Sequence, residues 1–313
     1  MNLQIIIPYY NGENYINALL NSIENSKKID ALALKVIIVD NSENPLKINN
    51  VLLGLSFETQ ILRTSKSNIG YSRACNVGIN HVSQSHYDYI MFLNQDTIFQ
   101  SDCIYQLISQ AILPVDRTIY SPRIFTDIDF QHSLNYMTSL SGTAPDCTQT
   151  TEEIDFIQGC CYLMPKQTLT LLEYFDPIFP LYGEDLDMIR RLKNKGGKLI
   201  MVQGARLYHR VSYLDTGLGE KAVRSSLLHI AEVINRYRHE QKSWIIVFFY
   251  FLTDLARAFR SFSPKISNKI ISNYIRFFSS IPSIKKHRSN QIRQRALSFL
   301  NKDTNLKVNT LTH

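Results

Sequence analysis

The sequence contains few cysteines and no hydrophobic run long enough to cross a membrane. Its 313 residues include five cysteines, which follow neither zinc-finger spacing nor the pattern of a disulfide-rich secreted domain, so we expect reduced thiols. The first residues lack a secretory signal, because the apolar run from Leu3 to Pro8 breaks at once into polar residues. The apolar run over residues 244–252 is interrupted by Thr253 and Asp254, well short of the roughly 20 residues that span a bilayer. These absences predict a cytosolic protein.

Acidic residues are scarce in the C-terminal third. Before residue 201 the chain has 15 basic and 21 acidic side chains, and after it 19 basic and 6 acidic ones, so the two parts carry about −6 and +13. A protein that bound nucleic acid over its whole surface would not segregate charge in this way. A basic end on an acidic body suggests one anionic contact surface, for which membrane phospholipid is the leading candidate.

The first two hundred residues alternate between strand and helix patterns. With 44% hydrophobic and 19% charged residues, the composition is that of a globular protein. Continuous apolar runs end at Pro8, Asp40 and Asn94, with helical spacing between them. Such strands favour an α/β fold with a parallel sheet covered on both faces. Ligands bind beyond the carboxyl ends of these strands, so the polar residues there should share one rim.

The remaining chain is less uniform. Residues 118–155 are rich in Ser, Asp, Thr and Gln and predict a loop-rich insertion that covers the site. A helix is expected from near Gly183 to Asn194, and a strand over residues 198–202. Beyond Thr216 the pattern changes to long helical stretches.

Asp96 is the one full anion in the strand-end segment Asn94-Gln95-Asp96. A carboxylate at a strand end can hold Mg²⁺ or Mn²⁺ and so offset the charge of a diphosphate. Asp and Asn after a strand are also ordinary turn residues, and that alternative stays open. His209 follows another strand-like run and could supply a ring nitrogen to the same metal, although most isolated histidines are not ligands.

Two other segments suit a nucleotide or a sugar. Asp40 closes a strand, where its carboxylate can accept hydrogen bonds from a nucleobase imide or a ribose hydroxyl. Asn68 and Gly70 form a turn into a helix that opens with Arg73, a geometry suited to a phosphate or to sugar hydroxyls. An ordinary loop with an exposed Arg is the alternative.

Three carboxylates begin the predicted helix at Gly183. Glu184, Asp185 and Asp187 lie where the helix dipole favours the ionised form, which a general base requires. Acids at a helix start are usually structural, but three exceed the needs of capping.

The C-terminal segment combines basic and aromatic residues. From Ala256 to His313 there are 12 basic residues and one acid, Asp303, interleaved with aromatic side chains. Membrane-surface helices and RNA-binding segments both use these residue types, and a packed helical subdomain with a solvated basic face is the third interpretation.

In this order, the motifs resemble glycosyltransferase family 2, in particular its bacterial rhamnosyltransferase-like branch. The resemblance covers roughly residues 3–212 and implies a GT-A fold, an α/β domain whose mostly parallel central sheet is flanked by helices. The catalytic domain would then span residues 1–215, with a donor-binding part at about 1–115 and an acceptor-side part at about 116–215. Residues 216–313 would form a C-terminal helical, membrane-associating extension. Five blocks carry the resemblance: Ile5 to Gly12, Val39 to Ser42, Asn68 to Gly78, Leu93 to Asp96, and Gly183 to Asp187.

The resemblance also implies roles for individual residues. Asp185 matches the catalytic base, and Asp96 with His209 matches the Mn²⁺ or Mg²⁺ site. Asn94 replaces the first aspartate of the family's Asp-x-Asp motif, which leaves Asp96 as the main carboxylate ligand. Gly159 and Glu184 are expected on the acceptor side. The expected donor-binding residues are Pro8, Tyr9, Asn11, Asp40, Asn41, Asn68, Gly70, Arg73, Asn94 and Gln95.

The implied reaction is an inverting, metal-dependent transfer of rhamnose from dTDP-rhamnose to a lipid-linked saccharide, in the synthesis of a cell-surface polysaccharide. A UDP-hexose or UDP-galactofuranose transferase would use the same residues, and a non-catalytic membrane or RNA adaptor is the alternative from another class. A sugar-nucleotide pyrophosphorylase is disfavoured, because the segment Tyr10 to Glu13 lacks the basic, glycine-rich phosphate loop. We expect a peripheral protein on the inner face of the cell membrane that binds no nucleic acid; a homodimer is left open.

Overall fold

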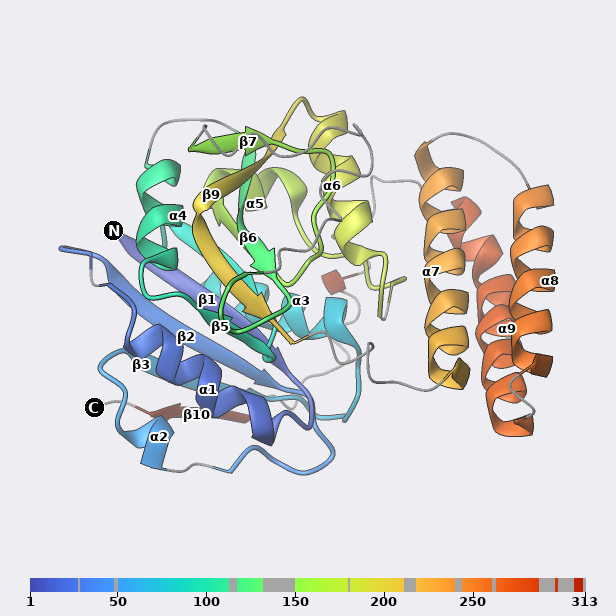
Figure 1. Cartoon of the computed structure of the whole chain (residues 1–313), viewed down its shortest axis with the longest axis horizontal. Helices are drawn as coiled ribbons and strands as arrows, with labels where there is room; N and C mark the ends of the chain where they lie inside the picture. The colour runs from blue at the N-terminus through green and yellow to red at the C-terminus, as the bar shows by residue number, and fades with distance from the viewer. Residues whose placement is uncertain are drawn as a thin grey trace.

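The computed structural model describes residues 1–27, 29–47, 50–112, 117–131, 150–179, 181–210, 218–239, 244–260, 263–286, 296–297 and 307–311. These residues form an α/β body and, beside it, a layer of long helices from the C-terminal part of the chain (Figure 1).

A single sheet runs through the body in the order β10-β3-β2-β1-β4-β8-β6-β9-β5, and β7 pairs with β9. Its strands are β1 (Asn2–Tyr9), β2 (Ala33–Asp40), β3 (Glu58–Arg63), β4 (Tyr89–Leu93), β5 (Thr97–Phe99), β6 (Thr118–Phe125), β7 (Thr151–Glu153), β8 (Cys161–Pro165), β9 (Lys198–His209) and β10 (Lys307–Leu311).

The N-terminal half of this sheet is parallel, as the apolar runs predict. Strands β3, β2, β1 and β4 all run in one direction, and β8 is antiparallel to both of its neighbours, β4 and β6. The sheet is therefore mixed beyond β4. Ile5, Ile6 and Ile7 are all fully buried, because helices cover both faces of β1 and leave neither side to solvent.

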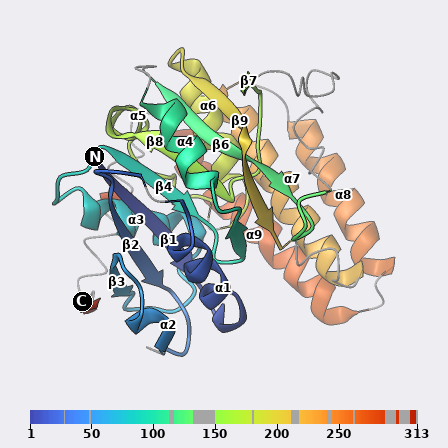
Figure 2. The same cartoon turned by 60° about the vertical axis from the view of Figure 1, so that its left-hand side comes forward.

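Helices cover the sheet on both faces, with α1 and α4 on one and α3 and α5 on the other (Figures 1 and 2). The helices of the body are α1 (Glu13–Glu24), α2 (Asn50–Leu53), α3 (Tyr71–Val82), α4 (Cys103–Ala111), α5 (Lys166–Leu172) and α6 (Glu184–Asn194). Helix α6 confirms the helix expected after Gly183. Cys75, Cys103, Cys160 and Cys161 are buried free thiols, as expected, and Cys147 lies outside the described residues.

The expectation of a loop-rich insertion over residues 118–155 is wrong at both of its ends. Residues Thr118–Phe125 form β6, which pairs with β8 and β9, and Thr151–Glu153 form β7. Two of the polar residues that suggested a loop, Thr118 and Ser121, are buried within the sheet, where the Ser121 hydroxyl donates a 3.0 Å hydrogen bond to the Cys161 carbonyl. Residues 132–149 of the same stretch lie outside the described residues.

The C-terminal helices α7 (Leu218–His239), α8 (Trp244–Arg260) and α9 (Pro264–Lys286) pack against one another. The fully buried carboxylate of Asp254 joins all three, since it accepts hydrogen bonds from His229 Nδ1 at 2.9 Å, Tyr274 Oη at 2.7 Å and Arg257 Nη1 at 3.2 Å. None of the helices within the described residues is both long and apolar enough to cross a bilayer.

The C-terminal part of the chain contacts the body through its helices, through Ala296 in the main core and through a strand. Phe179 packs with Ala231 of α7 and Phe277 of α9 in one small hydrophobic cluster. Strand β10 pairs antiparallel with β3 at the edge of the sheet that lies farther from α7, α8 and α9 (Figure 1). The sequence analysis expected only helices in this region and did not anticipate β10.

Candidate functional site

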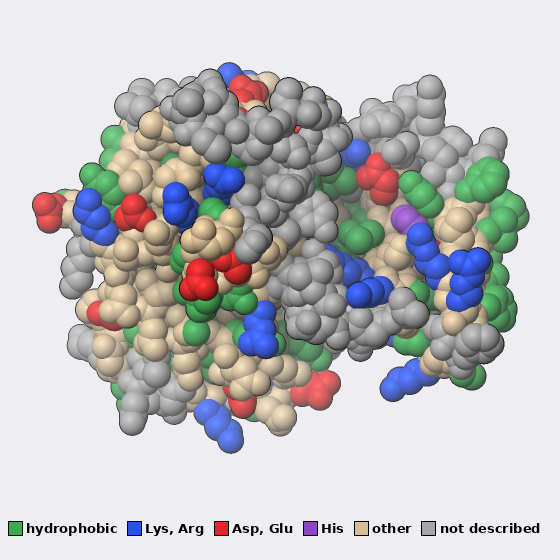
Figure 3. Space-filling model, viewed as in Figure 1, with side chains coloured by type: hydrophobic (Ala, Val, Ile, Leu, Met, Phe, Trp, Pro, Cys, Tyr) green, Lys and Arg blue, Asp and Glu red, His purple; other side chains and the backbone are tan. Residues whose placement is uncertain are grey.

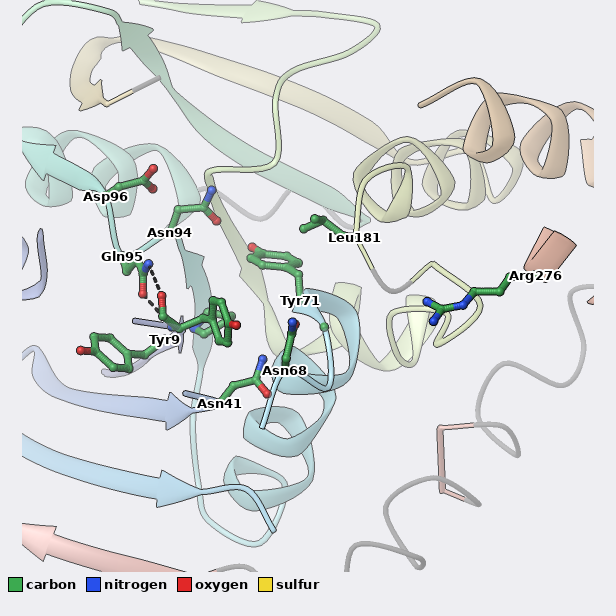
Figure 4. A pocket seen from close by; sticks show the side chains of 12 residues that line it. Tyr9, Asn41, Asn68, Tyr71, Asn94, Gln95, Asp96, Leu181 and Arg276 are labelled. Atoms are coloured by element: carbon green, nitrogen blue, oxygen red, sulfur yellow. Dashed lines mark hydrogen bonds between the residues drawn. The ribbon is translucent and has the colours of Figure 1, made fainter. Parts of the chain in front are cut away.

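A pocket of about 470 Å³ opens at the carboxyl ends of β1, β2 and β4, where the sequence analysis expects a rim of polar residues. Figure 4 shows side chains from several elements converging on it. The pocket is lined by Pro8, Tyr9, Tyr10, Asn41, Asn68, Gly70, Tyr71, Asn94, Gln95, Asp96, Leu181 and Arg276.

Most of the expected donor-binding residues line this pocket together with Asp96. The expected residues that it brings together are Pro8, Tyr9, Asn41, Asn68, Gly70, Asn94 and Gln95. Asn11, Asp40 and Arg73 are not among its lining residues, and neither are Gly159, Glu184, Asp185 and His209.

Gln95 joins two loops of the rim. Its Oε1 accepts a 2.8 Å hydrogen bond from the Tyr10 backbone N–H, and its Nε2 donates at 3.0 Å to the Tyr10 carbonyl (Figure 4). The side-chain amide therefore pairs with the loop after β1 as a neighbouring strand would. Gly12 makes room for it, because a Cβ at position 12 would lie 2.4 Å from Gln95 Oε1.

Asp40 organises the loop after β2 rather than lining the pocket. Its buried carboxylate accepts hydrogen bonds from the backbone N–H groups of Ser42, at 3.1 Å, and Leu46, at 2.8 Å. It also forms a 2.8 Å ion pair with Arg63. These three donors use most of its acceptor capacity inside the protein.

Asn41 connects that loop to the turn before α3. Its Oδ1 accepts a 2.7 Å hydrogen bond from the Ile69 backbone N–H, and its carbonyl accepts one at 2.8 Å from Asn68. Asn68 and Gly70 have φ values of 52° and 91°, which is the left-handed region that Asn tolerates and Gly adopts freely. Arg73, one turn into α3, donates at 3.4 Å to the Pro177 carbonyl, so its guanidinium contacts the segment before α6.

Asp96 and His209 lie next to each other where β5 pairs with β9. Asp96 Oδ1 is 3.4 Å from Nε2 of the buried His209. Burial lowers the pKa of His209, but Cys160 and Asp96 outweigh it and raise this pKa to about 10. The His209 imidazole therefore pairs with the carboxylate as a cation.

The same two side chains fit a weak divalent-metal site once His209 gives up its proton, because Nε2 of the cation has no lone pair for a metal ion. Two ligands at right angles around Mg²⁺, each about 2.1 Å from the ion, are about 3 Å apart, close to the Asp96–His209 separation. Among the described residues no group of three or more His, Cys, Asp or Glu side chains could hold a metal ion. Mg²⁺ is commonly bound through one or two carboxylates and completes its shell with water and substrate phosphates, so Asp96 suits such an ion as its carboxylate ligand.

Asp185 lies two hydrogen bonds away from the pocket. Its Oδ2 accepts a 3.3 Å hydrogen bond from the Gly159 backbone N–H, and the Gly159 carbonyl accepts one at 3.3 Å from the hydroxyl of the pocket residue Tyr71. Gly159 is required here, because a Cβ at this position would lie 2.8 Å from Asp185 Cβ. Glu184 is buried beside Asp185 at the start of α6.

Both carboxyl groups at this helix start are difficult to ionise. Burial raises the pKa of Asp185 above its ordinary value, although hydrogen bonds from the backbone of Leu186 and Gly159 oppose the increase. The pKa of Glu184 is raised further, by burial and then by the charge of Asp185. The charge of Asp185 therefore adds to burial in disfavouring the ionised form of Glu184.

Four residues of the pocket were not predicted from the sequence: Tyr10, Tyr71, Leu181 and Arg276. Tyr10 and Tyr71 directly follow predicted site residues, so position alone could have suggested them. Arg276 had no local signal, because it comes from α9 and reaches the pocket only through the packing of the C-terminal helices.

The chain is similar to known proteins both in sequence and in structure. Residues 4–168, more than half of the chain, match the family described as Glycosyl transferase family 2. No curated protein matches the chain in sequence.

The chain is also similar to solved structures, and the first of the two described next shares its fold. A structure of GalNAc-T7 with UDP, GalNAc and Mn²⁺ is similar with a TM-score of 0.57 and 14% identity, over 92% of this chain and 58% of that one. A structure of TarS from S. aureus has a TM-score of 0.49 and 12% identity, over 91% of this chain and 55% of that one. The chain thus spans a little more than half the length of these two proteins.

Proposed function

The chain belongs to glycosyl transferase family 2 and is a glycosyltransferase, and from that premise we propose that it transfers a sugar from a nucleotide diphosphate to a hydroxyl group with inversion. The observation that carries the proposal is the pocket at the carboxyl ends of β1, β2 and β4, with Asp96 at one side and Asp185 behind Tyr71. In open α/β sheets this rim is where ligands bind.

In this proposal the nucleotide occupies the part of the pocket lined by Pro8, Tyr9 and Asn41. Asp96 and His209 would hold a divalent cation, which supplies positive charge to the departing diphosphate. UDP and Mn²⁺ are present in the GalNAc-T7 structure of similar fold.

Asp185 is the proposed base. It takes the proton of the acceptor hydroxyl while that oxygen attacks the anomeric carbon from the face opposite the diphosphate. The bond from the anomeric carbon to the diphosphate breaks, and the nucleoside diphosphate leaves with its electron pair. The fixed N–H of Gly159 holds the Asp185 carboxylate in place, so little reorganisation precedes the proton transfer.

We further propose dTDP-rhamnose as the donor and a lipid-linked saccharide of a bacterial cell-surface polysaccharide as the acceptor. The rhamnosyltransferase-like motifs support this donor, and a UDP-hexose or UDP-galactofuranose is the second candidate. Calorimetric titration with dTDP-, UDP- and GDP-sugars in the presence of Mn²⁺ distinguishes them.

The C-terminal helices support a membrane-bound acceptor. Phe248, Phe249 and Phe259 of α8 are exposed, with 59%, 61% and 67% of their surfaces accessible. Lys and Arg side chains gather on the face of this helical region seen in Figure 3, and apolar ones lie along its outer edge over α8. Apolar and basic side chains together suit the interface of an anionic bilayer, so we propose peripheral binding at the cytoplasmic face.

The base assignment is tested with Asp185→Asn. We expect transfer to fall by at least about a hundredfold, since the amide cannot accept the proton, while nucleotide-sugar binding persists. Glu58→Gln, which neutralises an exposed carboxylate on β3, is the control and should keep full activity. Full activity in the Asp185→Asn enzyme would overturn the assignment.

The metal assignment is tested with Asp96→Ala. We expect this variant to lose the part of nucleotide binding that depends on Mn²⁺ and to keep the part that does not, as measured by calorimetry with and without the ion. An Mn²⁺ dependence equal to that of the wild type would contradict the assignment.

A further inference from the structure

The charged side chains of the pocket come from two distant parts of the chain. Among its lining residues only Asp96 and Arg276 carry a full charge at neutral pH. Asp96 follows β4 in the body, whereas Arg276 belongs to α9 in the C-terminal helices. The one cationic side chain that lines the pocket therefore comes from a helix outside the segment that matches the family.

The position of Arg276 is fixed by its neighbours along α9. Tyr274 is buried and donates its hydroxyl to Asp254 at 2.7 Å. Phe277 is buried against Phe179 and Ala231. Because these two aromatic side chains anchor the same helical turn, the arginine between them is presented to the pocket by a rigid element.

The guanidinium of Arg276 has no acceptor of its own within the described residues. Its side chain is exposed, and the Ser279 hydroxyl bonds to the backbone carbonyl of Arg276 rather than to its guanidinium. Figure 4 shows the guanidinium extending from the helical region towards the side of the pocket where Leu181 and Tyr71 lie. An arginine in this setting offers its N–H donors to a ligand rather than to the protein.

A phosphoryl group matches this donor set. The planar guanidinium can bind two phosphate oxygens at once, and its charge is permanent. Arg276 provides positive charge from the side of the pocket where Leu181 and Tyr71 lie, away from the Asp96–His209 pair.

We propose that Arg276 binds the diphosphate group of a substrate, so that the C-terminal helices supply a binding residue to the transfer site. This inference rests on the proposed function and deepens it. Both the nucleotide donor and a lipid-diphosphate-linked acceptor carry this group, and the experiment separates the two sources.

The experiment compares the wild type with Arg276→Gln and Arg276→Lys by calorimetry, using inorganic diphosphate, UDP and dTDP as ligands. Charged hydrogen bonds of this kind correspond to about a tenfold change in affinity, which is the loss expected for Arg276→Gln. Arg276→Lys should lose less, because it keeps the charge and loses the planar fork. Lys269→Gln is the matched control, since it removes one exposed cation from the same helix outside the pocket and should bind as the wild type does.

The pattern of losses identifies the source. Weaker binding of UDP or dTDP, with unchanged binding of the free nucleoside, assigns Arg276 to the donor. Unchanged nucleotide binding, with a raised KM for a lipid-diphosphate-linked acceptor and an unchanged kcat, assigns it to the acceptor. Wild-type affinities in Arg276→Gln for diphosphate, UDP and dTDP, together with a wild-type acceptor KM, would overturn the inference.

The outcome is separable from that of the proposed function. If Arg276→Gln loses affinity for inorganic diphosphate while the wild type transfers no sugar from any nucleotide, the proposed function fails and the assignment of Arg276 survives. If transfer depends on Asp185 and Arg276→Gln behaves as the wild type, the proposed function survives and the assignment of Arg276 fails.

Discussion

The proposed base Asp185 meets opposing demands within one side chain. A base must be ionised to accept a proton, yet burial raises the pKa of this carboxyl and favours its protonated form. The backbone N–H groups of Leu186 and Gly159 partly restore the ionised form. The balance gives a carboxylate that is more basic than an exposed aspartate and still held in one orientation.

A pH profile follows from this direction of shift. Because the pKa of Asp185 lies above its ordinary value of 3.8, transfer should fall as the pH drops through the raised pKa, at a higher pH than an exposed aspartate would give. The measurement is kcat/KM against pH for the wild type. An acidic limb at the ordinary aspartate value would contradict the prediction, and the residual activity of Asp185→Asn should lack that limb.

The same shift has a stability consequence with a defined sign. A carboxyl whose pKa is raised on folding contributes stability at a pH below its unfolded pKa, and this contribution is lost as the pH rises through the folded pKa. Thermal unfolding should therefore show Asp185→Asn to be more stable than the wild type at neutral pH, and the difference should shrink in acid. Loss of activity with gain of stability would mark a residue kept for function.

Residues at strand ends illustrate how far sequence reasoning reaches. Pro8, Asn94 and Asp96 were expected on one rim because parallel strands end together, and all three line the pocket. Asp40 satisfied the same rule, but its side chain turns inward to three donors. Strand position is encoded locally, whereas the direction of a side chain depends on partners such as Arg63 that are distant in sequence.

At the scale of elements, α6 begins where two parts of the molecule meet. Gly183 precedes this helix with φ at +87°, and a Cβ there would lie 2.2 Å from the Cβ of Ala231 on α7. The acidic helix start is thus in close contact with the C-terminal helices. Gly183 is required both for its backbone conformation and for its lack of a side chain.

We expect Gly183→Ala to destabilise the protein by about 1–3 kcal/mol, because it adds backbone strain to a steric overlap. Ala231→Gly in the same chain removes the overlapping methyl group, so the double variant should recover part of the loss and retain the part due to φ. Urea unfolding of the wild type, both single variants and the double variant measures the two parts. Equal stabilities of Gly183→Ala and the double variant would rule out the contact with α7 as a cause.

Elements differ in how well the sequence predicts them. Strands β1, β2 and β4 were predictable because burial on both faces leaves a continuous apolar run. Strand β6 was not, since Thr118 and Ser121 are polar side chains buried within the sheet. Strand β10 was missed as well, because it is defined by pairing with β3, more than two hundred residues earlier in the chain.

On the scale of the whole molecule, the C-terminal helices have two different surfaces. One surface contacts the body through Phe277 and presents Arg276 to the pocket. The other exposes Phe248, Leu252 and Phe259, which lie within about 40° of one another on α8 at 100° per residue. In our proposal the exposed side chains bind the membrane, and the opposite surface keeps the pocket close to it.

Point substitutions test this membrane surface better than truncation. Removing the chain after about residue 240 would also remove Arg276, β10 and the cover over Phe179, so a loss of binding or activity would have several causes. Phe248→Ser together with Phe259→Ser removes two exposed aromatic side chains, changes no charge and leaves the Asp254 network intact.

Binding of this double variant to vesicles containing phosphatidylglycerol should be about tenfold weaker than that of the wild type, because each aromatic side chain that enters the interface contributes through its buried apolar area. Leu53→Ser is the control: it removes an exposed apolar side chain from α2, on the body, and should not affect vesicle binding. Sedimentation with these vesicles measures the effect. Neutral phosphatidylcholine vesicles should bind all three proteins weakly, since membrane binding by the helical region also depends on attraction between its basic residues and anionic lipids. If the double variant and the wild type sediment equally with anionic vesicles, the exposed face of α8 does not bind the membrane.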